Sequence, residues 1–156
     1  MSDVTETWEA YERSVLAFER VLHSCMVDVP TEGMIIRPVD CDEDCAAFMA
    51  DHGINPENID DHLDLFEAWA ESSVLEIVNI SRQGWAEDEP TIDAVELLLA
   101  FGGPNVRLTV PVRFNTAWAT LSVHWASDSY EREIYVPALF ELLEYQSQFY
   151  VAQGVN

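Results

Sequence analysis

The apolar residues of this chain change their spacing once, near Ser72, and this change limits the possible folds more than any other feature of the sequence. Before Ser72 apolar residues recur every three or four positions, which is typical of amphipathic helices. After Ser72 they form short strand-like runs, which glycine, proline, asparagine and serine separate. The sequence therefore predicts a helical first half followed by a sheet.

Three helices are expected before Ser72. The first covers residues 4–25, and its apolar face comprises Trp8, Tyr11, Val15, Phe18 and Leu22. The second covers residues 42–51 and ends at Gly53, which serves as a C-terminal cap. The third covers residues 55–71, because Pro56 stands in the first turn, where proline is favoured. Between the first two helices, residues 34–36 are predicted to form an isolated strand.

The second half is expected to contain a sheet and one closing helix. The predicted strands are residues 74–81, 92–101, 106–112, 118–125 and 131–135. Short connections between successive strands favour an antiparallel meander. A last helix is predicted from Pro137 to residue 151. The predicted fold class is α+β: N-terminal helices, then an antiparallel sheet of four to five strands, then a C-terminal helix.

Length and composition indicate one compact domain. The chain has 156 residues, and 49% of them are apolar, which is typical of a folded protein. Within this domain, residues 1–72 form an acidic helical part, and residues 73–156 form the sheet and its closing helix. No apolar run approaches the roughly 20 residues that span a bilayer, so a cytoplasmic protein is expected.

The charge of the chain is strongly negative. It has 29 acidic residues and seven basic ones, all arginine, which gives a formal net charge of −22. This charge density repels nucleic acids, anionic membranes and other copies of the chain. Direct binding to nucleic acid or to a membrane is therefore not expected, whereas a basic protein is a suitable partner.

The charge is also unevenly distributed. Between Arg37 and Arg82 there is no other lysine or arginine, whereas from Leu97 to Ser127 there is no acidic residue. If the sheet shows one face to solvent, its lack of charge indicates a surface for self-association or for a partner. A homodimer through the sheet would double the negative field.

The expected third helix carries a row of acidic residues: Glu57, Asp60, Asp61, Asp64, Glu67 and Glu71. All but Asp61 are three or four positions apart, so they are expected to stack on one helical face about 5–6 Å apart. Such a row imitates the regular charges of a nucleic-acid backbone. Together with Asp42, Glu43 and Asp44 on the second helix, these residues are predicted to bind a basic nucleic-acid-binding protein.

Three other interpretations of the sequence stay open. The acidic face can simply be solvated and keep the protein soluble. The charge can be an adaptation of a structural or interaction domain to high salt, because screening reduces the Debye length to about 3 Å at 1 M. The chain can also be a small-molecule binding protein or an enzyme, with a site over the sheet near Arg107 and Trp125.

No catalytic, cofactor or metal site is predicted. There is no nucleophile elbow, phosphate-binding glycine loop or paired-histidine motif, so a non-enzymatic protein is expected. Cys41 and Cys45 are four residues apart, but a structural zinc site usually needs four ligands, and burial in a core is the favoured interpretation. His52 and His62 are expected to be local charge partners of neighbouring acids.

The arginines of the sheet are expected to have structural partners. Arg107 and Arg113 lie on or beside strands in the segment without acids. Pairing with a carboxylate of a neighbouring helix is favoured for both over ligand binding.

Part of the second half is similar to known proteins. Its most specific motif is Leu97-Leu98-Leu99, two further residues, and then Gly102-Gly103-Pro104-Asn105-Val106-Arg107. Gly84-Trp85 precedes this motif, and the run from Leu121 to Trp125 follows it. Over residues 74–152 the chain resembles a group of uncharacterised proteins encoded on plasmids, conjugative elements and phages. Those proteins commonly have aspartate where this chain has His124.

The resemblance implies a setting for the acidic surface. Mobile elements often encode acidic proteins that neutralise DNA-binding defences of the host, including restriction enzymes and CRISPR complexes. Taken with the net charge, the resemblance leads us to expect an anti-restriction or anti-CRISPR inhibitor that acts as a DNA mimic.

Overall fold

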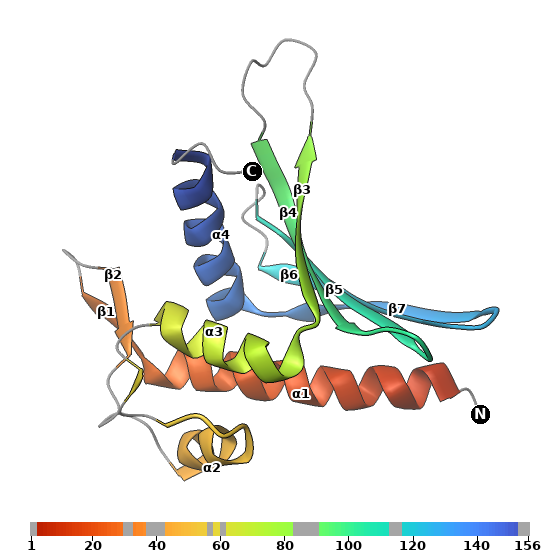
Figure 1. Cartoon of the computed structure of the whole chain (residues 1–156), viewed down its shortest axis with the longest axis horizontal. Helices are drawn as coiled ribbons and strands as arrows, with labels where there is room; N and C mark the ends of the chain where they lie inside the picture. Colours follow the sequence, from red (N-terminus) through yellow and green to blue (C-terminus); the bar gives the residue numbers. More distant parts are fainter. Residues whose placement is uncertain are drawn as a thin grey trace. The chain divides into compact units, whose positions relative to one another are not determined.

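The fold is α+β, as predicted, with N-terminal helices, a five-stranded antiparallel sheet and a C-terminal helix (Figure 1). The computed structural model describes residues 3–29, 33–36, 43–55, 58–59, 62–82, 91–112 and 117–152. The chain forms two compact units: the first comprises residues 1–12 together with 74–156, and the second comprises residues 13–73. Helix α1 (Asp3–Cys25) contributes to both units.

The first unit contains the sheet. Its strands are β3 (Glu76–Arg82), β4 (Thr91–Ala100), β5 (Asn105–Pro111), β6 (Trp118–Trp125) and β7 (Asp128–Tyr135). They follow one another in space in the order of the sequence, and every neighbouring pair is antiparallel. The predicted meander is confirmed, and β3 and β7 are its two edges.

One face of this sheet forms the core of the unit. Leu97, Leu108 and Leu121 lie side by side on β4, β5 and β6, and all three are buried. Helix α4 (Pro137–Ala152) packs against β4 and β5 and buries Leu139 and Leu143. The residues between the buried ones in β5 are half-buried, so this strand alternates as period-2 patterning requires.

The start of α1 also belongs to this core. Trp8 is buried, and its indole N–H donates a hydrogen bond of 2.7 Å to the backbone oxygen of Leu121 in β6. Its ring meets that of Tyr130 in β7 edge-to-face, with 5.3 Å between the centroids. The first turns of the helix are therefore fastened to the sheet by one side chain that is both large and hydrogen-bonded.

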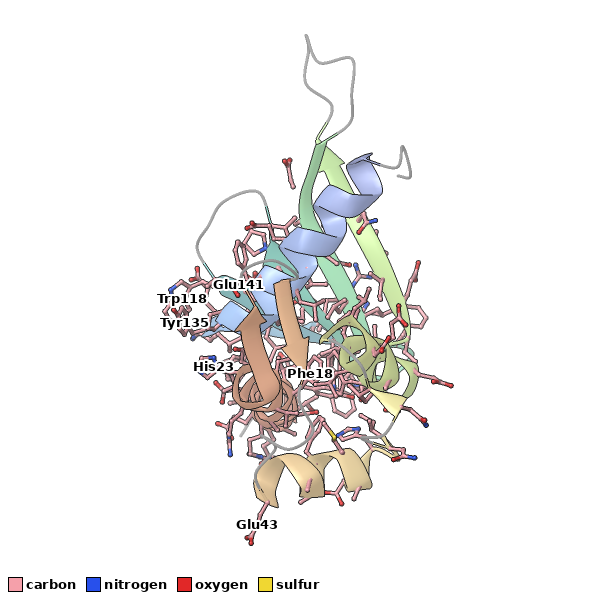
Figure 2. All side chains as sticks on the ribbon, turned by 90° about the vertical axis from the view of Figure 1, so that its left-hand side faces the viewer. Phe18, His23, Glu43, Trp118, Tyr135 and Glu141 are labelled. Atoms are coloured by element: carbon pink, nitrogen blue, oxygen red, sulfur yellow. The ribbon has the colours of Figure 1, made fainter. Side chains whose placement is uncertain are left out.

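The second unit contains the rest of α1, a hairpin of β1 (Met26–Val29) and β2 (Gly33–Ile36), and the helices α2 (Glu43–Asp51) and α3 (His62–Ser73). Phe18 of α1 lies inside this unit (Figure 2). Its ring stacks on Trp69 of α3 with 4.1 Å between centroids, and it also meets Phe66 of α3 and Phe48 of α2. Aromatic side chains from three helices thus form the centre of the unit.

Two predicted elements differ from the structure. The strand predicted at residues 34–36 is not isolated, because Gly33–Ile36 pairs antiparallel with Met26–Val29. Antiparallel pairing satisfies the backbone groups on the facing sides of the two short strands. The strand β1 was missed because it follows α1 directly, with no glycine or proline to end the helical pattern.

The third helix begins later than predicted, at His62 and not at residue 55. The N–H of Asn58 donates to the backbone oxygen of Asn55 at 3.0 Å and closes a turn, and the buried Ile59 after it is not helical. The proposed cap at Gly53 is confirmed. Gly53 has a φ of +68°, its N–H donates to Ala50 O at 3.1 Å, and the N–H of Ile54 donates to Met49 O at 2.7 Å, which together form a Schellman motif.

Candidate functional site

Helix α3 has one apolar side and one acidic side. Leu65, Phe66 and Trp69 are buried against the aromatic centre of the second unit. At about 100° per residue, the three acidic residues of this helix fall within an arc of roughly 60° on the opposite side. These residues are Asp64, Glu67 and Glu71, and we call them the acidic face of α3.

The acidic face is directed outward by the packing of α3. Glu67 and Glu71 are exposed, and Asp64 is half-buried and has a partner in the structure. Trp69, on the buried side, stacks on Phe18 with only 6° between the ring planes. A helix held by such a contact has little freedom to rotate about its axis, so its carboxylates keep their direction.

The other predicted residues are distributed as follows. Glu43 is exposed at the first position of α2, and Figure 2 shows that its side chain points away from this helix. Asp44 is the second residue of α2. Asp42, Glu57, Asp60 and Asp61 lie outside the described residues. Of the predicted row, the described helix His62–Ser73 carries Asp64, Glu67 and Glu71.

A second acidic row was missed in the sequence. Glu6, Glu9 and Glu12 recur every three residues in the first turns of α1, and Glu6 and Glu9 are exposed. This row belongs to the sheet unit, whereas the acidic face of α3 belongs to the other unit. The same spacing rule that identified the row on the third helix identifies this one.

The guanidinium of Arg107, in the region of the predicted alternative site, has partners within the protein. Nη1 of Arg107 in β5 lies 2.7 Å from Oε1 of Glu96 in β4, and its Nε donates to Oδ1 of Asn105 at 3.2 Å. These contacts favour the interpretation of Arg107 as a structural partner, although the carboxylate comes from the neighbouring strand and not from a helix. Arg113 lies outside the described residues.

Aromatic side chains are exposed at the β6–β7 side of the sheet. Trp118 and Tyr135 are opposite one another on adjacent strands, with 5.2 Å between their ring centroids, and lie together at the surface (Figure 2). Trp125 is exposed at the end of β6. Exposed aromatic side chains of this kind are compatible with a surface for association.

The described histidines and cysteines do not form a metal site. His52 packs on the ring of Phe48, with 4.3 Å between the centroids. Cys41 lies outside the described residues, and Cys45 is on α2. Among the described residues, no three histidine, cysteine or acidic side chains are close enough together to hold a metal ion.

Within the described part of the chain, no helix has the length and the apolar content needed to cross a membrane. Comparison of the chain with protein-family models, with curated proteins and with solved structures gave no match.

Proposed function

We propose that this protein inhibits a DNA-binding protein by presenting the acidic face of α3 to the surface that normally holds DNA. The observation that carries the proposal is the placement of Asp64, Glu67 and Glu71 on one side of a helix whose other side is buried. At a rise of about 1.5 Å per residue, these carboxylates follow one another every 4–6 Å or so, similar in scale to successive phosphates.

The net charge supports the same proposal. A chain of net charge −22 attracts a basic partner over a long range, which raises the rate of encounter. The partner in this proposal is a host defence protein, a restriction enzyme or a CRISPR complex, in agreement with the setting that the resemblance implies. The protein itself binds no nucleic acid and catalyses no reaction.

A small-molecule site near Arg107 and Trp125 is a weaker proposal. The guanidinium of Arg107 already has Glu96 and Asn105 as partners, so a ligand would have to displace them.

Adaptation to high salt is a different alternative, and measuring the stability of the fold at low salt distinguishes it from mimicry. A salt-adapted domain unfolds there, whereas the proposed inhibitor binds most tightly under those conditions.

The test is a capture experiment from the lysate of a bacterium that encodes CRISPR and restriction systems. The immobilised protein is expected to retain a nuclease or a CRISPR component at low salt, and short duplex DNA is expected to displace it. Charge reversal in Glu67→Arg/Glu71→Arg is expected to weaken this retention by at least about tenfold, because like charges then face the basic surface.

The matched control is Glu6→Arg/Glu9→Arg on α1, which makes the same change in net charge at another exposed acidic row. This variant is expected to retain the captured protein, and circular dichroism checks that both variants are folded. Equal losses in the two variants would mean that only the total charge matters. A captured protein that DNA does not displace, or no captured nucleic-acid-binding protein at all, would refute DNA mimicry.

A further inference from the structure

Strand β3 is one of the two edge strands of the sheet. Among the residues that the structure describes, it pairs with β4 alone. The register of the pairing between β3 and β4 shifts at Asp93, which is an extra residue in β4. Strand β3 is therefore continuous from Glu76 to Arg82. A continuous edge strand presents a row of backbone N–H and C=O groups that can pair with another strand.

This edge is unusually apolar. Large side chains on and beside β3 are exposed: Leu75 by 64%, Ile77 by 46%, Val78 by 39% and Ile80 by 38%. The other edge strand, β7, carries Asp128, Glu131, Arg132 and Glu133, and all four are exposed. Charged residues along an edge hinder pairing with other chains. They are present within β7, whereas in β3 they are only the first and the last residue.

The sequence of β3 is complementary to itself. Its first residue is Glu76, its last is Arg82, and Asn79 is at the midpoint. When two copies of this strand run antiparallel about Asn79, Glu76 of each copy is opposite Arg82 of the other. Val78 of each copy is then opposite Ile80 of the other. Opposite charges and β-branched residues are favourable cross-strand pairs.

Other registers lose this complementarity. A slip of one residue places Glu76 opposite Ser81 and Arg82 opposite Leu75 of the second copy. It also turns the strand of the second copy over, so that all of its side chains exchange faces of the sheet. Of the antiparallel self-pairings of this strand, only the one centred on Asn79 opposes the two charged residues.

We propose that two copies of this protein associate through β3, antiparallel and in the register centred on Asn79, to give one continuous ten-stranded sheet. This proposal goes beyond the proposed inhibitor function and does not depend on it. The two are also affected oppositely by salt. Two chains of net charge −22 repel each other, so salt strengthens the dimer, whereas salt weakens binding of the acidic face to a basic partner.

The first test is sedimentation velocity across a range of concentrations. An interface of one seven-residue strand is small, so dimers are expected over about 5–500 µM protein. The dimer fraction is expected to rise between about 0.1 M and 1 M NaCl as screening increases. A chain that stays monomeric throughout this range would overturn the proposal.

Two lysine variants locate the interface. Val78→Lys is expected to weaken the dimer by at least about tenfold, because it buries two charged groups at the β3 edge. Ser129→Lys on β7 is the matched control, since it makes the same charge change at the other edge, and it is expected to leave the dimer unchanged. Both variants reduce the negative net charge, which by itself favours association. A dimer that Val78→Lys leaves intact would show that β3 is not the interface.

A charge swap tests the register. Glu76→Arg is expected to weaken the dimer by about tenfold, because arginine then faces Arg82 of the second copy. The double variant Glu76→Arg/Arg82→Glu is expected to restore the dimer to within about threefold of the original. Failure of the double variant to recover, with its fold verified by circular dichroism, would reject this register.

A disulfide gives an independent readout of the same register. The three native cysteines are first replaced by alanine, and the fold of that variant is checked. Asn79→Cys in this background is expected to form a linked dimer on oxidation, because residues opposite one another in antiparallel strands have Cα atoms about 4.5–5.5 Å apart. Ile77→Cys is the control, since its two copies would be separated by about 13 Å along the strand. Equal linkage of the two variants would contradict the register.

Discussion

Helix α3 and strand β3 follow each other in the chain, with Val74 and Leu75 between them, but they expose opposite kinds of side chain. The helix exposes Glu67 and Glu71. The strand exposes isoleucine and valine on an edge. The difference shows that exposure depends on the place of an element in the fold more than on how apolar it is.

The physical basis of this difference is the number of neighbours that each element has. A helix packed on one side can bury its whole apolar stripe, as α3 does with Leu65, Phe66 and Trp69. An edge strand has a neighbour on one side only, so its apolar side chains remain partly exposed on both faces. The helix therefore offers charge that acts over a distance, and the strand offers backbone and apolar groups that act on contact.

The buried side of α3 is expected to show the largest effect. Trp69→Ala should lower the free energy of unfolding by about 3–5 kcal/mol, because it removes the ring that stacks on Phe18 and leaves a cavity. Chemical denaturation followed by circular dichroism measures the change. Glu71→Ala, on the outer side, is the control and should change stability by less than about 0.5 kcal/mol. A Trp69→Ala variant as stable as this control would contradict the packing of α3.

Two tryptophans extend the comparison to the interiors of the two units. Trp8→Phe should cost about 1–3 kcal/mol, because Leu121 O loses the indole N–H that donates to it. Trp69→Phe should cost less, because the buried indole N–H of Trp69 has no acceptor among the described residues. Denaturation curves of the two variants give the difference, and a larger loss for Trp69→Phe would show that its N–H does have an acceptor.

The exposed side chains of β3 are expected to matter little for the folded monomer. Ile77→Thr/Ile80→Thr should lower the free energy of unfolding by at most about 1 kcal/mol at low protein concentration, because these side chains are already partly in water. At high concentration and high salt, where the proposed dimer forms, the same variant should lose more. A similar loss at both concentrations would mean that β3 stabilises the monomer alone.

The acidic face should give the smallest effect, with the opposite sign. Glu67 and Glu71 are one turn apart on α3, so their carboxylates repel each other. Glu67→Gln should therefore raise the free energy of unfolding by about 0.2–0.5 kcal/mol at low salt. The gain should vanish near 1 M salt, where charges are screened within about 3 Å. A variant that is less stable at low salt would show that Glu67 is held by a favourable contact.

The strands were predictable because their signal is local. Residues 118–125 were predicted as a strand and form one with the same bounds, and the strand predicted at residues 106–112 is shifted by one position. The signal consists of alternating apolar residues and of the glycines Gly102 and Gly103 that separate two strands. These are within a few residues of each other in sequence. The first turns of the third helix were not predictable in this way, because a turn at Asn55 and Asn58 and the burial of Ile59 replace them.

The candidate site was predictable only in part. The spacing of Asp64, Glu67 and Glu71 predicted a common face, and the structure has it. The partner of Arg107 was not predictable, because Glu96 reaches it through the pairing of β4 with β5. Pairing between strands depends on register, which the alternation of one strand does not specify.

By itself, the sequence determined the net charge of −22, the fold class and the acidic spacing of α3, because composition and periodicity are local properties of the chain. Only the tertiary structure decided that β3 is an edge strand, that Phe18 turns the acidic face of α3 outward, and that Trp8 fastens α1 to β6. These features join residues that are far apart in the chain, and such contacts follow from the packing of the whole core.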